Sequence, residues 1–182
     1  AGGNIQYAYD GIDQLTQVID PRTLATSYTV DGLGRLATQV SPDTGTTTRV
    51  YDAAGNLTTH TDARGVVSRF TYDALDRLTK ATYTGPSGAG IAGVTVTYTY
   101  DAGSYGKGRL TGFTDASGSS AYTYDPKGRL SAETRTISAA AYTTQYGYDS
   151  AGRLNRITYP SGRTVDTSFD AAGRIRAIDT TA

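Results

Sequence analysis

The chain alternates short segments of period-two polarity with clusters of turn-forming residues. Before five of the aspartate turns, two aromatic residues stand two positions apart, as in the pair Phe70 and Tyr72 or the pair Tyr122 and Tyr124. Aromatic residues alternating with threonine at period two are typical of β-strands. No segment carries a sustained apolar stripe at 3.6-residue spacing, which an amphipathic helix would show. The pattern therefore predicts a chain built of short strands and turns.

An aspartate opens the turn after each aromatic strand, and it recurs along the whole chain. These aspartates stand at positions 10, 31, 52, 73, 101, 125, 149 and 170, with steps of 21, 21, 21, 28, 24, 24 and 21 residues. Tyrosine precedes the aspartate in six copies, and Val30 and Phe169 precede it in the other two. Self-similarity at such a period is the mark of a stacked repeat architecture. We expect one array over residues 1–182, with repeats at about 5–25, 26–46, 47–67, 68–95, 96–119, 120–143, 144–164 and 165–182.

Each repeat is predicted to be a β-hairpin closed by a three-residue loop. Aspartate at the first turn position and glycine at the fourth are the signature of a type I turn, and the glycine adopts positive φ to form a bulge. Gly55 and Gly152 are therefore expected to have positive φ. Asp13 and Asp76 replace this glycine in two copies, and aspartate tolerates that conformation better than most residues. The loop length sets the register, which places Tyr9 opposite Leu15.

The residue after the turn glycine is usually arginine, and the register places it opposite the aspartate. We expect Asp125 to approach Arg129 and Asp149 to approach Arg153, as exposed pairs that contribute little to stability. The repeated acid and base are interpreted as a structural ladder and not as a catalytic set. The motif residues given this structural role are Tyr9, Asp10, Leu15, Asp31, Arg35, Tyr51, Asp52, Gly55, Tyr72, Asp73, Arg77, Tyr100, Asp101, Tyr124, Asp125, Gly128, Arg129, Tyr148, Asp149, Gly152, Arg153, Phe169, Asp170, Gly173 and Arg174.

Composition bears on the fold class. Leucine, isoleucine, valine and phenylalanine together make 30 of the 182 residues, too few for an ordinary globular core, while fifteen tyrosines add apolar area. The predicted class is all-β, a curved strip of about eight consecutive antiparallel β-hairpins. The turns between repeats, often with proline or glycine, are expected to be looser. Two insertions, at 84–93 and 102–108, are expected to protrude as mobile loops.

Charge and hydropathy limit the partners. The formal net charge is zero, so no basic face for nucleic acid is expected. No apolar run approaches the roughly 20 residues of a membrane-spanning helix. The chain contains no cysteine, which excludes disulfides. It contains no methionine and no signal peptide at its start, which suggests a piece of a longer protein.

The pattern YDxxGRLxxxxxPxG, repeated about every 21 residues, resembles the Rhs/YD-repeat family. The segment YDAAGNLTTHTDARGVVSRFTYDALDRL is close to a family consensus. The family includes bacterial Rhs polymorphic toxins, the B–C components of insecticidal toxin complexes, cell-wall-associated bacterial proteins and animal teneurins. The resemblance implies a YD-repeat solenoid of hairpins that spirals into a hollow shell. In bacterial members the shell encloses a C-terminal toxin domain.

Four shorter patterns were weighed for chemistry. YDPKGRL, from Tyr124, resembles the start of the self-cleaving segment of bacterial relatives, but no second DPxG follows, so it is interpreted as an ordinary repeat. GAGIAG at 88–93 spells a dinucleotide-binding fingerprint, but a strand pattern follows it where a helix is required, so it is interpreted as a loop. His60, the only histidine, has no partners for a catalytic triad or a zinc site. Asn56 starts a glycosylation sequon, which matters only in a eukaryotic secretory pathway. We therefore predict no catalytic, cofactor-binding or metal-binding residue.

Three functions were compared. The leading interpretation is a non-enzymatic segment of a toxin-enclosing shell, secreted or at the cell surface as part of a larger bacterial protein, with neighbouring repeats and the enclosed toxin as partners. The alternative is an adhesion module that binds carbohydrate or a partner through exposed tyrosines, and an enzyme is the least favoured. The two leading functions differ in whether the tyrosines form an open groove or pair with leucines across strands. The terminal strands are expected to expose unpaired backbone groups, which favours edge-to-edge self-association.

Overall fold

The computed structural model describes residues 3–86 and 93–181, and this part of the chain consists of strands and turns without helix. It divides into two compact units, residues 1–95 and 96–182. The first unit contains β1 (Gln6–Tyr9), β2 (Leu15–Ile19), β3 (Ala25–Val30), β4 (Leu36–Ser41), β5 (Gly45–Tyr51), β6 (Leu57–Thr61), β7 (Val67–Tyr72) and β8 (Leu78–Thr84). The second begins within β9 (Val94–Tyr100) and contains β10 (Leu110–Asp115), β11 (Gly118–Tyr124), β12 (Leu130–Ile137), β13 (Ala140–Tyr148), β14 (Leu154–Thr158), β15 (Thr164–Phe169) and β16 (Ile175–Thr181).

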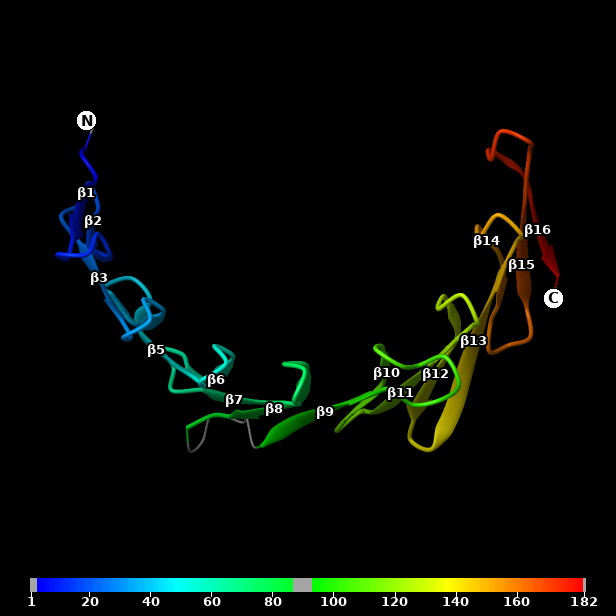
Figure 1. The fold of residues 1–182 in the computed structure, drawn as a ribbon, viewed down its shortest axis with the longest axis horizontal. Coiled ribbons are helices and arrows are strands. Elements are labelled where there is room, and N and C mark those ends of the chain that lie inside the picture. The colour runs from blue at the N-terminus through cyan, green and yellow to red at the C-terminus, as the bar shows by residue number, and fades with distance from the viewer. Residues whose placement is uncertain (1–2, 87–92, 182) are drawn as a thin grey trace. The chain divides into compact units, whose positions relative to one another are not determined.

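Within each unit every strand pairs antiparallel with the next strand of the chain (Figure 1). Strand order equals chain order, so each unit is a meander of consecutive hairpins. The predicted class, all-β with consecutive antiparallel hairpins, is confirmed. The prediction of one array over residues 1–182 stays a prediction, since each unit is compact by itself.

The predicted hairpin register is confirmed. Tyr9 faces Leu15, and the ladder shifts by one residue between Ala8 and Tyr9, which is the bulge that the turn glycine or aspartate requires. The same pairing recurs at Tyr51 with Leu57 and in the other hairpins closed by an aspartate turn. Because side chains alternate along a strand, this register fixes which residues share a face.

The two faces of each meander differ in chemistry. One face carries a column of mostly aromatic side chains, which we call the aromatic column, at the third residue before each motif aspartate: Tyr7, Tyr28, Arg49, Phe70, Tyr98, Tyr122, Tyr146 and Thr167. Phe113 on β10 lies between two members of this column, Tyr98 and Tyr122, with 6.4 Å between the centroids of neighbouring rings. The other face is rich in threonine, for example Thr48 opposite Thr61 and Thr38.

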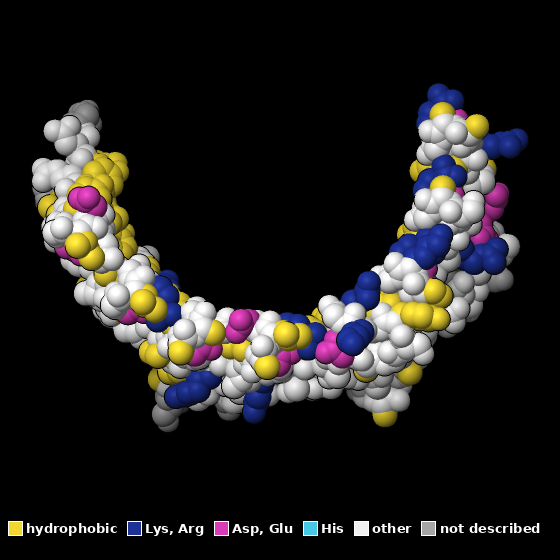
Figure 2. All heavy atoms as spheres, viewed as in Figure 1, with side chains coloured by type: hydrophobic (Ala, Val, Ile, Leu, Met, Phe, Trp, Pro, Cys, Tyr) yellow, Lys and Arg dark blue, Asp and Glu magenta, His cyan; other side chains and the backbone are white. Residues whose placement is uncertain are grey.

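Very little of the chain is buried. The buried apolar residues of the described part are Val66 and Ala81, and no large side chain is fully buried there. Apolar and charged side chains of both signs remain together at the surface (Figure 2). Each unit is therefore a single layer of sheet and lacks a second layer that would cover either face.

Candidate functional site

The aspartate turns at the ends of the hairpins, here called tight turns, carry the motif residues. In the turn after β13, the Asp149 N–H donates to the Arg153 carbonyl at 2.9 Å, and the Gly152 N–H donates to the Asp149 carbonyl at 3.0 Å. Gly152 has φ of 87° and Gly55 has φ of 96°, which confirms the predicted positive values. Asp13 and Asp76 adopt the same conformation, with φ of 62° and 57°.

The aspartate side chain organises the turn that it opens. Asp149 Oδ1 accepts a hydrogen bond from the Arg153 backbone N–H at 2.9 Å, and Oδ2 accepts one from Arg153 Nε at 2.7 Å. The backbone hydrogen bond lowers the pKa of Asp149 from its ordinary value, desolvation opposes this change, and the Arg153 guanidinium adds to it. The carboxylate is thus held in its charged form by the turn itself.

Aspartate and arginine pair across five of the tight turns, as the register predicts. These pairs are Asp31 with Arg35, Asp73 with Arg77, Asp125 with Arg129, Asp149 with Arg153, and Asp170 with Arg174. In the third hairpin Asn56 takes the place of arginine, and its side-chain amide donates to Asp52 at 3.2 Å and to Asp76 of the next hairpin at 2.7 Å. The Asn56 amide is therefore occupied within the fold.

Tyrosine has a role that the sequence reasoning missed, because four motif tyrosines join their hairpins to the preceding ones. The Tyr148 hydroxyl donates to the Leu130 carbonyl at 2.9 Å, across the boundary between two hairpins. Three further tyrosines make the equivalent bond: Tyr51 to Leu36, Tyr72 to Leu57, and Tyr124 to Leu110. The sequence signal was the spacing between the leucine and the next motif tyrosine, which is 15 residues in two of these cases.

Arginine adds a second link between hairpins. While Arg129 pairs with Asp125 in its own hairpin, its guanidinium carbon lies 4.2 Å from the centre of the Tyr148 ring in the next one. The same contact joins Arg35 to Tyr51 at 4.7 Å and Arg153 to Phe169 at 4.3 Å. A cation over an aromatic face contributes about 0.5–1 kcal/mol at an exposed site. Arg35, Arg129 and Arg153 thus make contacts both within their own hairpin and with the next one.

The fifth hairpin closes through its longer loop, and its arginine is used differently. Arg109 donates to the Tyr105 carbonyl at 3.3 Å and the Lys107 carbonyl at 3.2 Å, which ties the loop together, and to the Gly128 carbonyl of the next hairpin at 3.2 Å. Gly106 is buried, and a Cβ at this position would lie 1.9 Å from the Ala102 carbonyl oxygen. This loop is folded on itself and against β10. Residues 87–92 of the other predicted loop lie outside the described residues.

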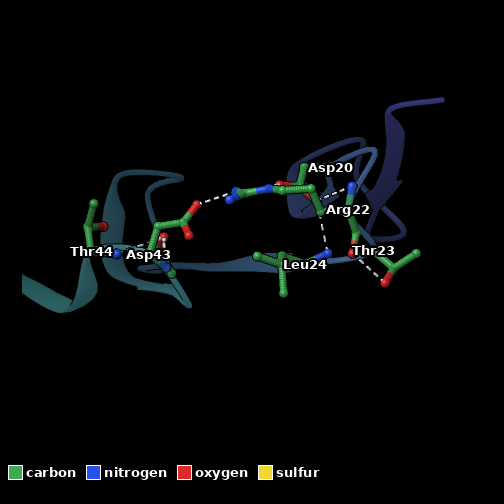
Figure 3. A network of polar contacts seen from close by, with 7 residues as sticks. Asp20, Arg22, Thr23, Leu24, Asp43 and Thr44 are labelled. Atoms are coloured by element: carbon green, nitrogen blue, oxygen red, sulfur yellow. Dashed lines mark hydrogen bonds and ion pairs between the residues drawn. The ribbon is translucent and has the colours of Figure 1, made fainter. Parts of the chain in front are cut away.

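The opposite edge of each unit carries the turns between repeats, and the prediction that these are looser is wrong for three of them. The turns from Asp20, Asp62 and Tyr159 close with the same pair of backbone hydrogen bonds as the tight turns. In the first of these, Asp20 Oδ1 accepts from the Arg22 and Leu24 backbone N–H groups. Arg22 also bridges Asp20 to Asp43 of the following such turn (Figure 3). A carboxylate can therefore form this loop without a preceding tyrosine.

The motif tyrosines are not an open groove. Tyr51, Tyr72, Tyr124 and Tyr148 are half-buried, face a leucine across the hairpin, and have their hydroxyls engaged. Tyr9, the motif tyrosine of the first hairpin, is exposed, and the other exposed tyrosines lie outside the motif at Tyr7, Tyr105, Tyr142 and Tyr159. The criterion stated from the sequence thus favours a structural role for the motif tyrosines.

Other candidate chemistry finds little support in the fold. His60 on β6 faces Arg49 and Ser68 on the neighbouring strands, which is not a triad. YDPKGRL forms an ordinary tight turn, in which the Gly128 N–H donates to the Asp125 carbonyl at 2.8 Å. Most of GAGIAG lies outside the described residues. Within residues 3–86 and 93–181, no group of three or more histidine, cysteine or acidic side chains is placed to hold a metal ion. No helix suited to crossing a bilayer occurs in that part either.

Two hollows lie along the tight-turn edges. One, of about 440 Å³, lies in the second unit between the long loop and the next hairpin, and Tyr105, Tyr122 and Tyr124 are among its lining residues. The other, of about 430 Å³, lies in the first unit between the first two hairpins. Neither is lined by an ionisable group other than tyrosine.

Solved structures show where this fold occurs. The chain is similar to the crystal structure of TcdB2-TccC3, with a TM-score of 0.82 and 18% identity over 98% of this chain, and to that of TcdB2-TccC3-Cdc42, with a TM-score of 0.81 and 18% identity over 98%. It is also similar to the Tc holotoxin pore of Photorhabdus luminescens, with a TM-score of 0.81 and 18% identity over 97% of this chain. In each case the chain spans only 10% of the matched chain. At this identity the likeness shows the fold alone.

Family models place the sequence more firmly. No curated protein sequence matches the chain significantly. Residues 51–89 match the RHS repeat, and residues 89–181, just over half of the chain, match the Teneurin YD-shell. The tight turns, the tyrosine links and the arginine contacts described above all recur within the matched segments. This chain belongs to the Teneurin YD-shell family.

Proposed function

We propose that this chain is a segment of the wall of a hollow shell that encloses a C-terminal toxin domain of a secreted or surface-exposed bacterial protein. The proposal treats the chain as a fragment of a longer protein, consistent with the 10% of the matched toxin-complex chains that it spans. Its partners in the parent would be the neighbouring repeats and the enclosed domain. The motif residues would act as a structural ladder, and the segment would have no catalytic role of its own.

The observation that carries the proposal is the lack of a core combined with strong links between neighbours. The chain exposes 11538 Å² of surface. Two separate compact domains, each of half its 19.1 kDa mass, would expose only about 10,100 Å² together. A hairpin alone is marginal in water, so each one depends on its neighbours, and the tyrosine and arginine links supply that dependence. Such a single layer suits a wall better than a pocket-bearing domain.

The parent protein offers a direct test of enclosure. Gly128→Val should disrupt the tight turn after β11 and its contact with Arg109, and thereby weaken the wall without touching the enclosed domain. Asp13→Gly serves as the matched control. Asp13 occupies the same turn position with positive φ, and glycine adopts that conformation without strain, so the turn should be preserved. Limited proteolysis of both full-length variants should cut the C-terminal domain faster in the valine variant only. If the C-terminal domain of the unmodified protein were cut as rapidly as that of the valine variant, this result would contradict enclosure.

A second function has one observation in its favour. The 440 Å³ hollow in the second unit combines the half-exposed ring of Tyr105 with Tyr122, Ser104 and Thr123, and aromatic rings with hydroxyl neighbours suit a sugar. An adhesion module would bind carbohydrate there. Tryptophan is absent from the chain, so tyrosine fluorescence can be followed during titration with simple mono- and disaccharides, and the Tyr105→Ala variant shows whether a change arises at this site. A saturable change that Tyr105→Ala abolishes would support carbohydrate binding, and an unchanged signal would remove it.

A further inference from the structure

The second hairpin departs from the others at the residue before its aspartate. Seven of the eight repeats carry an aromatic residue there, and the second carries Val30. Val30 keeps the regular register, because it faces Leu36 across the hairpin with the usual one-residue shift. The backbone is therefore regular, and only the ring is missing.

The contacts of the other tyrosines show what the missing ring would do. Tyr51 donates its hydroxyl to the carbonyl of Leu36, which lies 15 residues earlier, and Arg35 lies over its ring. Fifteen residues before Val30 is Leu15, and Gln14 takes the place of the arginine. In the described part of the chain, no side chain donates a hydrogen bond to the Leu15 carbonyl.

The hollow of about 430 Å³ in the first unit coincides with this vacancy. Its lining residues are Gln14, Leu15, Tyr28, Val30, Gly34 and Leu36. Leu15 and Leu36 are the leucines of the two adjoining hairpins. The Gln14 side-chain amide covers Gly34, with Nε2 3.0 Å from the position of a Cβ on that glycine, as Arg129 covers Gly152 with its NH1 at 3.4 Å. The walls of a regular tyrosine slot are thus present without the tyrosine.

We propose that this slot binds the phenol side chain of a tyrosine presented by another polypeptide segment. The ring would lie between Leu15 and Leu36 beneath the Gln14 amide, and its hydroxyl would donate to the Leu15 carbonyl. The occupant follows from the repeats themselves, because four equivalent slots of this chain hold a polypeptide tyrosine with its hydroxyl on the corresponding leucine carbonyl. No charged side chain lines the slot, which favours a neutral ring over an ionised ligand.

A small phenol makes the slot testable on the 182-residue chain. p-Cresol, the side-chain analogue of tyrosine, should shift the backbone amide resonances of residues 14–15 and 30–36 in a saturable manner. Toluene, which lacks the hydroxyl, should bind about fivefold more weakly, since one neutral hydrogen bond contributes about that factor. N-acetyl-tyrosinamide should compete with p-cresol, because the proposed occupant is a residue of a polypeptide.

Substitutions can fill this slot or open an equivalent one. Val30→Tyr supplies the missing ring and should abolish the p-cresol shifts, while Val30→Leu keeps an aliphatic residue and should reduce them less. Tyr51→Val should create a second slot with new shifts around Arg35 and Leu36. Tyr72→Val tests the same point around Leu57 if the first of these variants does not fold.

Three results would overturn the proposal. They are the absence of saturable shifts in the unmodified chain, binding that survives Val30→Tyr, and equal affinity for toluene and p-cresol. Binding of p-cresol without competition by N-acetyl-tyrosinamide would show that the slot takes free phenols only, and would remove the polypeptide from the proposal.

Discussion

Alanine substitutions of two glycines in equivalent turns, Gly152 and Gly128, can distinguish the cost of backbone strain from the cost of a lost contact between hairpins. Gly152 has φ of 87°, and a Cβ there would meet Arg129 NH1 at 3.4 Å, which is an ordinary van der Waals distance. Gly128 has φ of 77°, but its Cβ would lie 2.1 Å from Arg109 NH2 and 2.7 Å from the central guanidinium carbon. Alanine at both positions is strained by the backbone, whereas only alanine at 128 must displace an arginine.

The expected magnitudes follow from these contacts. Positive φ costs an alanine about 1–2 kcal/mol, so Gly152→Ala should destabilise by that amount. Gly128→Ala should cost about 1–2 kcal/mol more, because Arg109 would lose its hydrogen bond to the Gly128 carbonyl at 3.2 Å and its position 5.5 Å from the Tyr124 ring centre. Asp13→Gly, at the same turn position with φ of 62°, is the control and should change stability by less than about 0.5 kcal/mol.

Hydrogen exchange resolved along the chain is the appropriate assay, because a repeat array need not unfold in a single step. Gly152→Ala should lower protection mainly in β13 and β14. Gly128→Ala should lower it in β11 and β12, which flank its turn, and also in β10, which follows Arg109. Equal losses for the two alanine variants would show that the arginine contact contributes nothing. Unchanged protection in both would refute the argument from positive φ.

The remaining predictions concern single links, pH and the chain edges. Tyr148→Phe removes the hydrogen bond to the Leu130 carbonyl and should lower the free energy of unfolding in urea by about 1 kcal/mol. An unchanged free energy of unfolding would contradict this bond. A double-mutant cycle at Asp149 and Arg153 should give the small coupling of an exposed pair, and a large coupling would instead indicate a buried, functional ion pair. Folding lowers the pKa of Asp149, so the stabilisation from its carboxylate is complete above the ordinary aspartate pKa of 3.8 and is lost as pH falls through the folded value. The urea concentration at the unfolding midpoint should therefore stay constant from neutral pH to about 5 and decrease below about pH 4. This decrease should be less steep in Asp149→Asn. Because β1 and β16 are each paired on one side only, the 182-residue chain should form dimers or longer strips in sedimentation measurements at rising concentration, and a strictly monomeric chain with terminal strands as protected as residues 68–83 would contradict this.

The sequence predicted what short-range chemistry decides. Strand positions, the tight turns and the pairing of Tyr9 with Leu15 follow from the turn residues, because a three-residue loop allows one register. The Asp149–Arg153 pair follows from that register in turn. These features depend on residues within a few positions of one another, so the order of residue types was sufficient to place them.

Contacts between successive hairpins were not predictable in the same way. The hydroxyl of Tyr148 reaches the Leu130 carbonyl only because two hairpins lie at a particular offset, which no local pattern specifies. The slot beside Val30 could not be predicted for the same reason. A valine at this position is informative only once the structure shows that equivalent slots hold a tyrosine ring. The turn from Asp20 is one of the turns between repeats that were predicted to be looser, yet the aspartate carboxylate forms the same loop.

Motif side chains join one hairpin to the next, and a double-mutant cycle at Arg129 and Tyr148 measures this link most directly. The two residues belong to different hairpins, and the guanidinium lies 4.2 Å from the ring centre. Unfolding free energies of Arg129→Gln, Tyr148→Leu and the double variant should yield a stabilising coupling of about 0.5–1 kcal/mol. A coupling of zero would contradict the claim that the repeated tyrosine and arginine bind successive hairpins into a continuous wall.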